Sequence, residues 1–482
     1  MKKVLFAIAA AVLVCAACSK DPVLEVDNQS FTVSSKGDTV TVSVNCNKQW
    51  EMQYYDYVTT WCHYEVGDPV KDVTPVTFVI DANGESESRV AEFTFVSGDL
   101  SQTVTFTQSA FEVSEDAVNL SAAGTANCYI VAPGSKAYFN AGVKGNSTES
   151  VGSVVRARLE WQSEKGLIKS IKFAPATCQF EIETADVPGN AVIAAMSVDD
   201  RVLWSWHIWV VDYNPAASLY STPANASGTV WKFMDRNLGA TSTTRGDFAN
   251  AGVYYQWGRK DPFPGAAAFT VQNADYSYQQ DGEPTIYNFD GSVAFKISDL
   301  ANYNGSIENG IANPDVFYIV GSRDTGEVDE YGSPVYENVP RTSDWSDTSD
   351  DDAWGGVSMK KTIYDPCPAG YKVPVCDADG NTPYAWLTYQ KRTWDEKNRG
   401  VEQDGQWFPT NGTRVAQSGG LNYAESTPYS GLWIGTAGKA SSNLELYPTL
   451  YGQYMFIGSG KRTFKVSKDC RAQGMNVRCV AE

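Results

Sequence analysis

Cysteine and histidine are the residue types in this chain best suited to metal binding or nucleophilic catalysis, and their spacing favours neither. The 482 residues include only two histidines, His63 and His207. Eight cysteines follow the N-terminal pair Cys15 and Cys18, and no two of the eight have C-x-x-C spacing. Most zinc sites need closely spaced ligands, and Cys–His or Ser–His–Asp catalysts need a partnering histidine. We therefore predict no metal, no cofactor and no catalytic residue, and we expect a protein that is not an enzyme.

Carboxylates are the other groups that could do chemistry. The runs Asp344–Asp352 and Asp377–Asn381 are rich in oxygen ligands of the kind that Ca²⁺ prefers. Such runs are usually solvated loops, and the second lacks the later ligands of a calcium-binding loop. The sequence leaves calcium dependence open. It also leaves open a carboxylate pair for glycoside hydrolysis, because the separation of the two groups in space defines such a pair.

The N-terminus has the pattern of an export signal. Lys2 and Lys3 precede the apolar run Val4–Val14, which is too short to span a bilayer. Small residues then lead directly to Cys18, an arrangement that resembles the lipobox of bacterial lipoprotein precursors. The resemblance implies a signal peptide at 1–17, acylation of Cys18 and a short tether at 18–22. We expect a protein anchored by lipid in the outer membrane, facing the cell surface; the alternative is an ordinary signal peptide with an incidental cysteine.

Composition describes a folded, acidic chain. Hydrophobic residues make up 43% and charged residues 20%, which is enough apolar material for packed cores. The net charge of −19 disfavours binding to polyphosphate, so nucleic acid is not an expected partner. The length is typical of about three domains.

The segment 23–110 is expected to form an immunoglobulin-like β-sandwich. Polar and β-branched residues alternate along Thr39–Val44, and similar runs follow between turn-forming residues. The order Trp50, Trp61, Asn83, Arg89 and Gln108 resembles the BACON domain, the Bacteroidetes-associated carbohydrate-binding often N-terminal module. The family's name implies sugar binding, although such modules also act as spacers. We expect Trp50 and Trp61 to pack in the core, as tryptophans on sandwich strands usually do.

A second β-rich domain is predicted at 111–214, followed by a linker at 215–228. Leu203–Asp212 places apolar residues on both faces of a strand, which predicts burial on both sides. A sugar platform at Trp204 and Trp206 is the alternative to core packing.

The segment 229–482 contains six motifs in order, namely Trp231–Ala240, Gly252–Phe263, Tyr364–Pro374, Phe408–Gly412, Ser430–Thr436 and Gly474–Val480. With these motifs the segment resembles the major paralogous domain family, which is related to formylglycine-generating enzymes and C-type lectin-like folds. The resemblance implies a loop-rich α+β module in which the terminal strands pair. Cys367 and Cys479 lie in two of the motifs, and on that ground we expect them to form a disulfide. The whole chain is thus predicted to be mainly β, with two sandwiches followed by a C-type lectin-like module.

These features together favour a binding protein whose partner is a glycan or a host glycoprotein. Aromatic rings can stack on sugars while charged groups bind the hydroxyls. The candidate residues are Tyr254, Tyr255, Trp257, Arg259 and Asp261. A structural role for them in the module's core is the alternative. The alternative function is an adhesin or pilus-associated subunit with a protein partner, bound through sheet edges.

Overall fold

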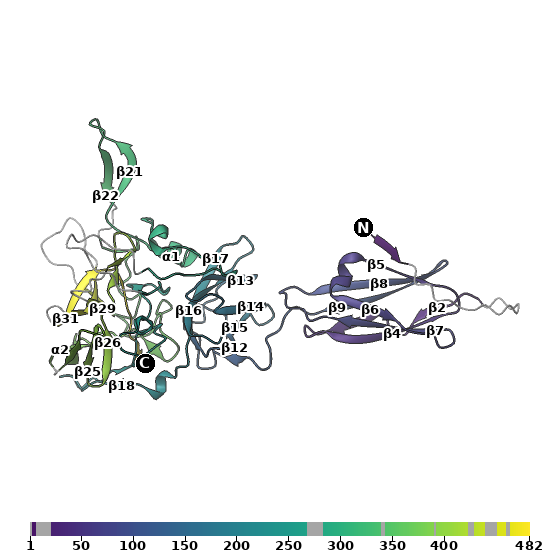
Figure 1. The fold of residues 1–482 in the computed structure, drawn as a ribbon, viewed down its shortest axis with the longest axis horizontal. Helices are drawn as coiled ribbons and strands as arrows, with labels where there is room; N and C mark the ends of the chain where they lie inside the picture. Colours follow the sequence, from purple (N-terminus) through teal and green to yellow (C-terminus); the bar gives the residue numbers. More distant parts are fainter. Residues whose placement is uncertain are drawn as a thin grey trace. The chain divides into compact units, whose positions relative to one another are not determined.

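A computed structural model describes residues 2–5, 21–267, 283–338, 343–389, 392–422, 429–438, 451–458 and 463–482 (Figure 1). The chain is mainly β, as predicted, with several sheets and two short α-helices among the described residues. It divides into two compact units. The first unit is residues 1–114 with 172–177, and the second is 115–171 with 178–482. No helix among the described residues is long and apolar enough to cross a bilayer.

The first unit is a β-sandwich of two layers, in which most strand pairs are antiparallel. Its sheets have the orders β1-β5-β8-β9-β3, in which β3 joins β9 in parallel, and β2-β4-β7-β6. The burial of β4 alternates along Val40–Cys46, so the predicted strand at Thr39–Val44 is confirmed. The elements are β1 Lys2–Leu5, β2 Leu24–Val26, β3 Ser30–Val33, β4 Asp38–Cys46, β5 Glu51–Tyr55, η1 Asp56–Thr60, β6 Cys62–Val66, β7 Val73–Ile80, β8 Arg89–Ser97 and β9 Leu100–Gln108.

The tryptophans of the first unit belong to its core. Trp50 and Trp61 are 7% and 8% exposed and pack in the hydrophobic cluster of the sandwich. The guanidinium of Arg89 lies 4.2 Å from the ring centre of Trp61 and donates to the side chain of Gln108. Arg89 also donates to the backbone carbonyls of Asp81 and Ala82, so these motif residues fasten that turn to the core.

The N-terminal signal is only partly described. The backbone of β1, which belongs to the predicted signal peptide, pairs with β5. Residues 6–20 lie outside the described residues, so Cys18 and its acylation stay a prediction.

The second unit begins with another pair of sheets, ordered β10-β12-β15-β14 and β11-β17-β16-β13. Strand β17 is buried along both faces, as its sequence predicted. The Trp206 ring packs against Phe139 and Phe180, and Trp204 is 0% exposed, so neither offers a surface platform for sugar. The strands are β10 Val118–Asn119, β11 Cys128–Val131, β12 Lys136–Asn140, β13 Arg156–Gln162, β14 Ile168–Ala174, β15 Gln179–Thr184, β16 Gly189–Met196 and β17 Val202–Val210.

The rest of the second unit consists of short strands, turns and loops. Strand β19, near the start of this part of the chain, pairs with β33 at its end. The β21–β22 hairpin projects from the body of the unit (Figure 1). The elements are η2 Pro215–Ala217, β18 Tyr220–Ser221, β19 Lys232–Phe233, η3 Phe248–Asn250, β20 Tyr255–Gln256, η4 Ile297–Leu300, α1 Ile307–Ala312, β21 Ser322–Val328, β22 Pro334–Asn338, β23 Tyr371–Lys372, α2 Ala385–Tyr389, β24 Thr393–Asp395, β25 Gly400–Gln403, β26 Gln406–Pro409, β27 Thr413–Arg414, β28 Leu421–Asn422, β29 Tyr429–Gly438, β30 Tyr451–Gly458, β31 Thr463–Cys470, β32 Gly474–Met475 and β33 Val480–Ala481.

One core runs through this second unit. Cys128 and Trp209, from the paired sheets, pack in the same buried cluster as Tyr255, Cys367 and Cys479. Residues 215–228, predicted as a linker, therefore join two parts of one compact unit.

Candidate functional site

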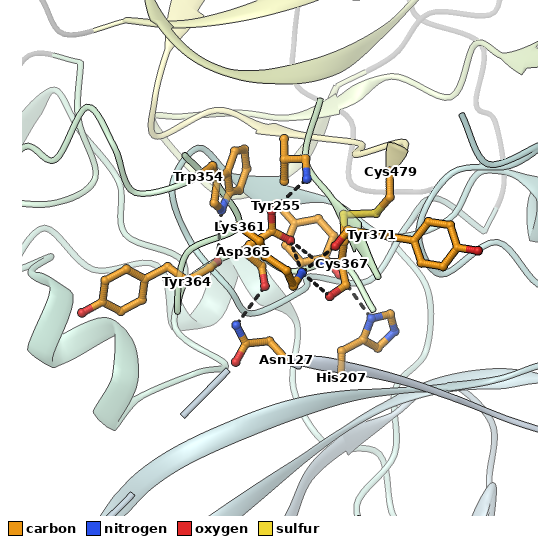
Figure 2. Close-up of a disulfide and its surroundings, with 11 residues drawn as sticks. Asn127, His207, Tyr255, Trp354, Lys361, Tyr364, Asp365, Cys367, Tyr371 and Cys479 are labelled. Atoms are coloured by element: carbon orange, nitrogen blue, oxygen red, sulfur yellow. Dashed lines mark hydrogen bonds and ion pairs between the residues drawn. A yellow bond between two sulfur atoms is a disulfide. The ribbon is translucent and has the colours of Figure 1, made fainter. Parts of the chain in front are cut away.

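The disulfide of the second unit lies in the buried cluster that also contains Cys128 and Trp209 from the paired sheets. Cys367 and Cys479 are bonded, with their Cα atoms 6.1 Å apart, and this is the pair predicted from the sequence. Beside it, Lys361 donates to the Asp365 carboxylate and to the carbonyls of Cys367 and Tyr371 (Figure 2). The same carboxylate accepts from the backbone of Cys367 and Val373. The motif Tyr364–Pro374 thus folds around a buried, fully engaged ion pair.

Polar contacts fasten this motif to the paired sheets. The Asn127 side chain donates to the carbonyls of Ile363 and Asp365 and accepts from the indole of Trp204. His207 bonds Asn190 through Nε2 and the Tyr255 hydroxyl through Nδ1. Burial lowers the pKa of His207 to about 3, so its ring is neutral and structural at physiological pH.

The five candidate binding residues divide into two groups. Tyr254 and Tyr255 are 0% exposed; their hydroxyls bond Asn411 and His207 inside the core. Trp257, Arg259 and Asp261 are also buried, at 2% or less, yet all three line one recess. The expected exposed stacking surface at these tyrosines and this tryptophan is therefore not present, because the rings fill the module's core.

The recess forms where the chain turns after β20. Gly258 has φ +83°, a conformation that a glycine adopts readily, and it turns the chain between Trp257 and Arg259. Helix α1 contributes Gly310 to the wall, and the acidic run contributes Asp344 and Trp345. The recess has a volume of about 30 Å³, which is room for one or two water molecules.

A broad groove adjoins the recess. It has a volume of about 510 Å³, and two of its lining residues, Asp350 and Tyr364, also line the recess. Asn146 from the loop between β12 and β13 and Asp352 from the acidic run complete its polar wall. Tyr364 is half-buried and Asp350 is exposed, so the combined site presents an aromatic ring beside carboxylate and amide groups.

Most cationic groups around the recess are engaged by the protein. Lys260 donates to the hydroxyl and carbonyl of Ser205 and to Asp261 Oδ1. Burial lowers the pKa of Lys260, while the adjacent Asp261 carboxylate opposes that shift. Arg471 binds Asp344 and Asp351, and its guanidinium lies 4.2 Å from the ring centre of Trp257.

The acidic runs do not gather a metal site in the part of the chain that the structure describes. No group of three or more histidine, cysteine, aspartate or glutamate side chains is placed there to hold an ion. In the second run, the Asp377 carboxylate accepts from Asn225, Thr229 and Asn381. Its oxygens therefore fasten the segment after η2 to the module.

Several residues of the site were not singled out from the sequence. Lys260, Tyr364 and Arg471 lie far apart along the chain and have no shared spacing. The signals available were indirect, because Lys260 lies within the motif Gly252–Phe263 and Tyr364 begins the motif Tyr364–Pro374.

Comparisons with known proteins assign no family. No protein-family model and no curated protein matches the chain. A Bacteroides ovatus GH5 xyloglucanase in complex with a XXXG heptasaccharide is similar over 23% of this chain and 27% of its own, with 18% identity and a TM-score of 0.17. Mouse clustered PcdhgC3 EC1-3 is similar over 40% and 69%, with 13% identity and a TM-score of 0.18. The titin Ig tandem A164-A165 is similar over 39% and 96%, with 10% identity and a TM-score of 0.17.

The chain thus covers well under two thirds of the xyloglucanase. At TM-scores below 0.5, none of these similarities indicates an activity.

Proposed function

We propose that this chain is a cell-surface lipoprotein, anchored to the outer membrane through Cys18, that binds glycans or host glycoproteins without converting them. The observation that carries the proposal is the shared wall of recess and groove, where Tyr364 lies beside Asp350. A half-buried aromatic ring flanked by hydrogen-bonding groups suits a sugar, which has apolar ring faces and polar edges.

The resemblances in the sequence support the same function. Residues 23–110 resemble the BACON domain, and 229–482 resemble the major paralogous domain with its C-type lectin-like fold. In this proposal the first unit is a spacer, because its two core tryptophans are buried. The second unit carries the ligand site.

The test is a glycan-array screen of the mature chain from residue 19 onward, run with calcium and again with a chelator. We expect saturable binding, and Tyr364→Ala should weaken it about tenfold, equivalent to about 1.4 kcal/mol. Tyr331→Ala is the matched control, because Tyr331 is 84% exposed on the projecting hairpin and lines neither cavity.

Each other outcome has a definite meaning. Equal loss in both tyrosine variants, or loss in neither, would overturn the assignment of the site. Loss of binding in chelator would overturn a metal-independent site and show that binding requires a divalent cation. No binding to any plant, mucin or host glycan would overturn the function in favour of a protein partner.

A further inference from the structure

Two buried atoms in the recess lack a hydrogen-bond partner. Among the described residues that line it, Arg259 Nε and Asp261 Oδ2 are the buried side-chain atoms left unpaired. They lie 4.0 Å apart, which is beyond hydrogen-bond length. Both side chains are 2% exposed, and leaving such groups unpaired costs free energy. The pair is therefore arranged for a third group.

The other atoms of these two residues are already committed. The Arg259 Nη atoms donate to the side chain of Gln256 and to the carbonyls of Val316 and Asn313. Asp261 Oδ1 accepts from Ser205 and Lys260. The side chains are thus held in place, and one donor and one acceptor remain available.

A hydroxyl group complements this pair, and charged groups do not. The third group must accept from Arg259 Nε–H and donate to Asp261 Oδ2. A hydroxyl oxygen does both, whereas an ammonium cannot accept and a carboxylate cannot donate. An oxygen about 2.8 Å from each atom satisfies both bonds.

The size of the recess restricts the hydroxyl to a small arm of the ligand. A volume of about 30 Å³ takes a hydroxymethyl group, while a sugar ring needs the adjoining groove. The recess apart from these polar atoms has largely apolar walls, including Ile307, Ile311 and Trp345. A primary alcohol on a short carbon arm matches both the volume and the walls.

Acidic ligands are disfavoured at the same place. The cations Lys260, Arg471 and Lys361 donate to protein acceptors. Asp350 and Asp352 line the groove and Asp261 lines the recess, so a ligand carboxylate would lie close to negative charge in both places.

We propose that the recess binds the primary hydroxyl of a neutral hexose whose ring lies in the adjoining groove. This inference rests on the proposed glycan-binding function and names its ligand class. The chain should therefore discriminate against 6-deoxyhexoses and uronic acids. In both, the group that enters the recess lacks a hydroxyl oxygen that can accept from Arg259 and donate to Asp261.

The test compares methyl glycosides by titration calorimetry with the mature chain. We expect methyl hexopyranosides to bind at least about tenfold more tightly than their 6-deoxy and uronic acid counterparts, because a methyl or carboxylate in the recess leaves a buried polar group unpaired. Methyl pentosides should lose less affinity relative to the hexosides, because the recess can keep a water molecule when no carbon arm of the ligand enters it.

Gly310→Ala tests the recess without removing its polar groups. A Cβ at Gly310 would lie 3.9 Å from Arg259 Nε and 3.1 Å from the Trp345 ring, so it narrows the recess. We expect this variant to abolish the preference for hexose over 6-deoxyhexose. Gly84→Ala is the control, since its Cβ would meet only the end of Lys172 at 3.9 Å.

The outcomes separate this inference from the function. Equal binding of hexose and 6-deoxyhexose, with both lost in Tyr364→Ala, would overturn the hydroxyl site and leave glycan binding standing. Tighter binding of the uronic acid would do the same. A chain that binds no sugar, on the array or as a glycoside, would overturn both.

Discussion

The two units of this molecule bury different kinds of residue. In the first unit the buried residues are apolar or neutral, and Phe78, Phe93 and Phe106 pack together at its centre. In the part of the chain that the structure describes, every buried charged side chain belongs to the second unit. These are Glu160, Glu181, Arg259, Lys260, Asp261, Asp344, Lys361, Asp365, Arg414, Arg471 and Arg478.

The difference follows from how backbone groups find partners. In the first unit, long strands such as β8 and β9 satisfy their carbonyls through the sheet. The second unit has many short strands and loops, so its buried carbonyls need other donors. Cationic side chains supply them: Arg414 donates to Pro264 and Gly419, and Arg478 donates to Trp407. Substitutions should therefore cost the first unit little stability, whereas the stability of the second unit should depend on particular side chains.

The largest expected effect is removal of the disulfide. The bond closes a loop with a sequence separation of 112, and the unfolded chain gains freedom without it. Replacing both Cys367 and Cys479 by alanine should destabilise the second unit by about 4 to 5 kcal/mol. Calorimetry should show its transition moving to lower temperature while the transition of the first unit stays in place. Equal movement of both transitions would break the comparison.

A matched pair of arginine variants tests the dependence on buried cations. Arg414 is 0% exposed and pairs with Glu283, so Arg414→Met leaves a buried carboxylate and two carbonyls without partners. We expect a cost of about 3 to 5 kcal/mol in denaturant unfolding. Arg89→Met in the first unit should cost only about 1 kcal/mol, because water can replace its contacts at the surface. A similar loss of unfolding free energy in both variants would contradict the proposed difference between the two units.

The same contrast explains what could be predicted from the sequence. Alternation along Thr39–Val44 records burial directly, so the first sandwich could be derived residue by residue. The two apolar faces of Leu203–Asp212 predicted burial on both sides for the same reason. Local periodicity is sufficient where a strand's neighbours need only be apolar.

The packing of the second unit depends on contacts between residues far apart in the sequence, which local periodicity does not indicate. Ser205 meets Asp261, Asn127 meets Asp365, and Arg471 meets Asp344 across long stretches of chain. The disulfide cysteines were found through a family resemblance and not through spacing. The recess is lined by Trp257, Arg259 and Asp261, which are nearly consecutive in the sequence. Tyr364, which also lines it, belongs to a distant segment of the chain.

Acid should destabilise the second unit through His207. Its pKa is about 3 in the folded chain and near 6.5 when unfolded, so the unfolded state binds the extra proton between these values. The stabilisation from the neutral ring is fully present well above pH 6.5 and falls as pH drops, by about 1.6 kcal/mol from pH 6.5 to pH 5. Denaturant titrations at both pH values should show this loss in the wild type and a smaller one in His207→Gln. The same pH slope in both proteins would assign the acid sensitivity to other groups.

The smallest expected effect concerns the surface of the first unit. Thr94 and Thr103 face each other across β8 and β9, with their hydroxyl oxygens 3.0 Å apart. Such cross-strand pairs contribute about 0.2 to 1 kcal/mol, and water can replace the lost bond in Thr94→Ala. We expect the denaturation midpoint of the first unit to fall slightly and that of the second to stay unchanged. A cost as large as that of Arg414→Met would mean that the first unit also depends on specific polar contacts. In that case, burial of charge would not be what distinguishes the two units.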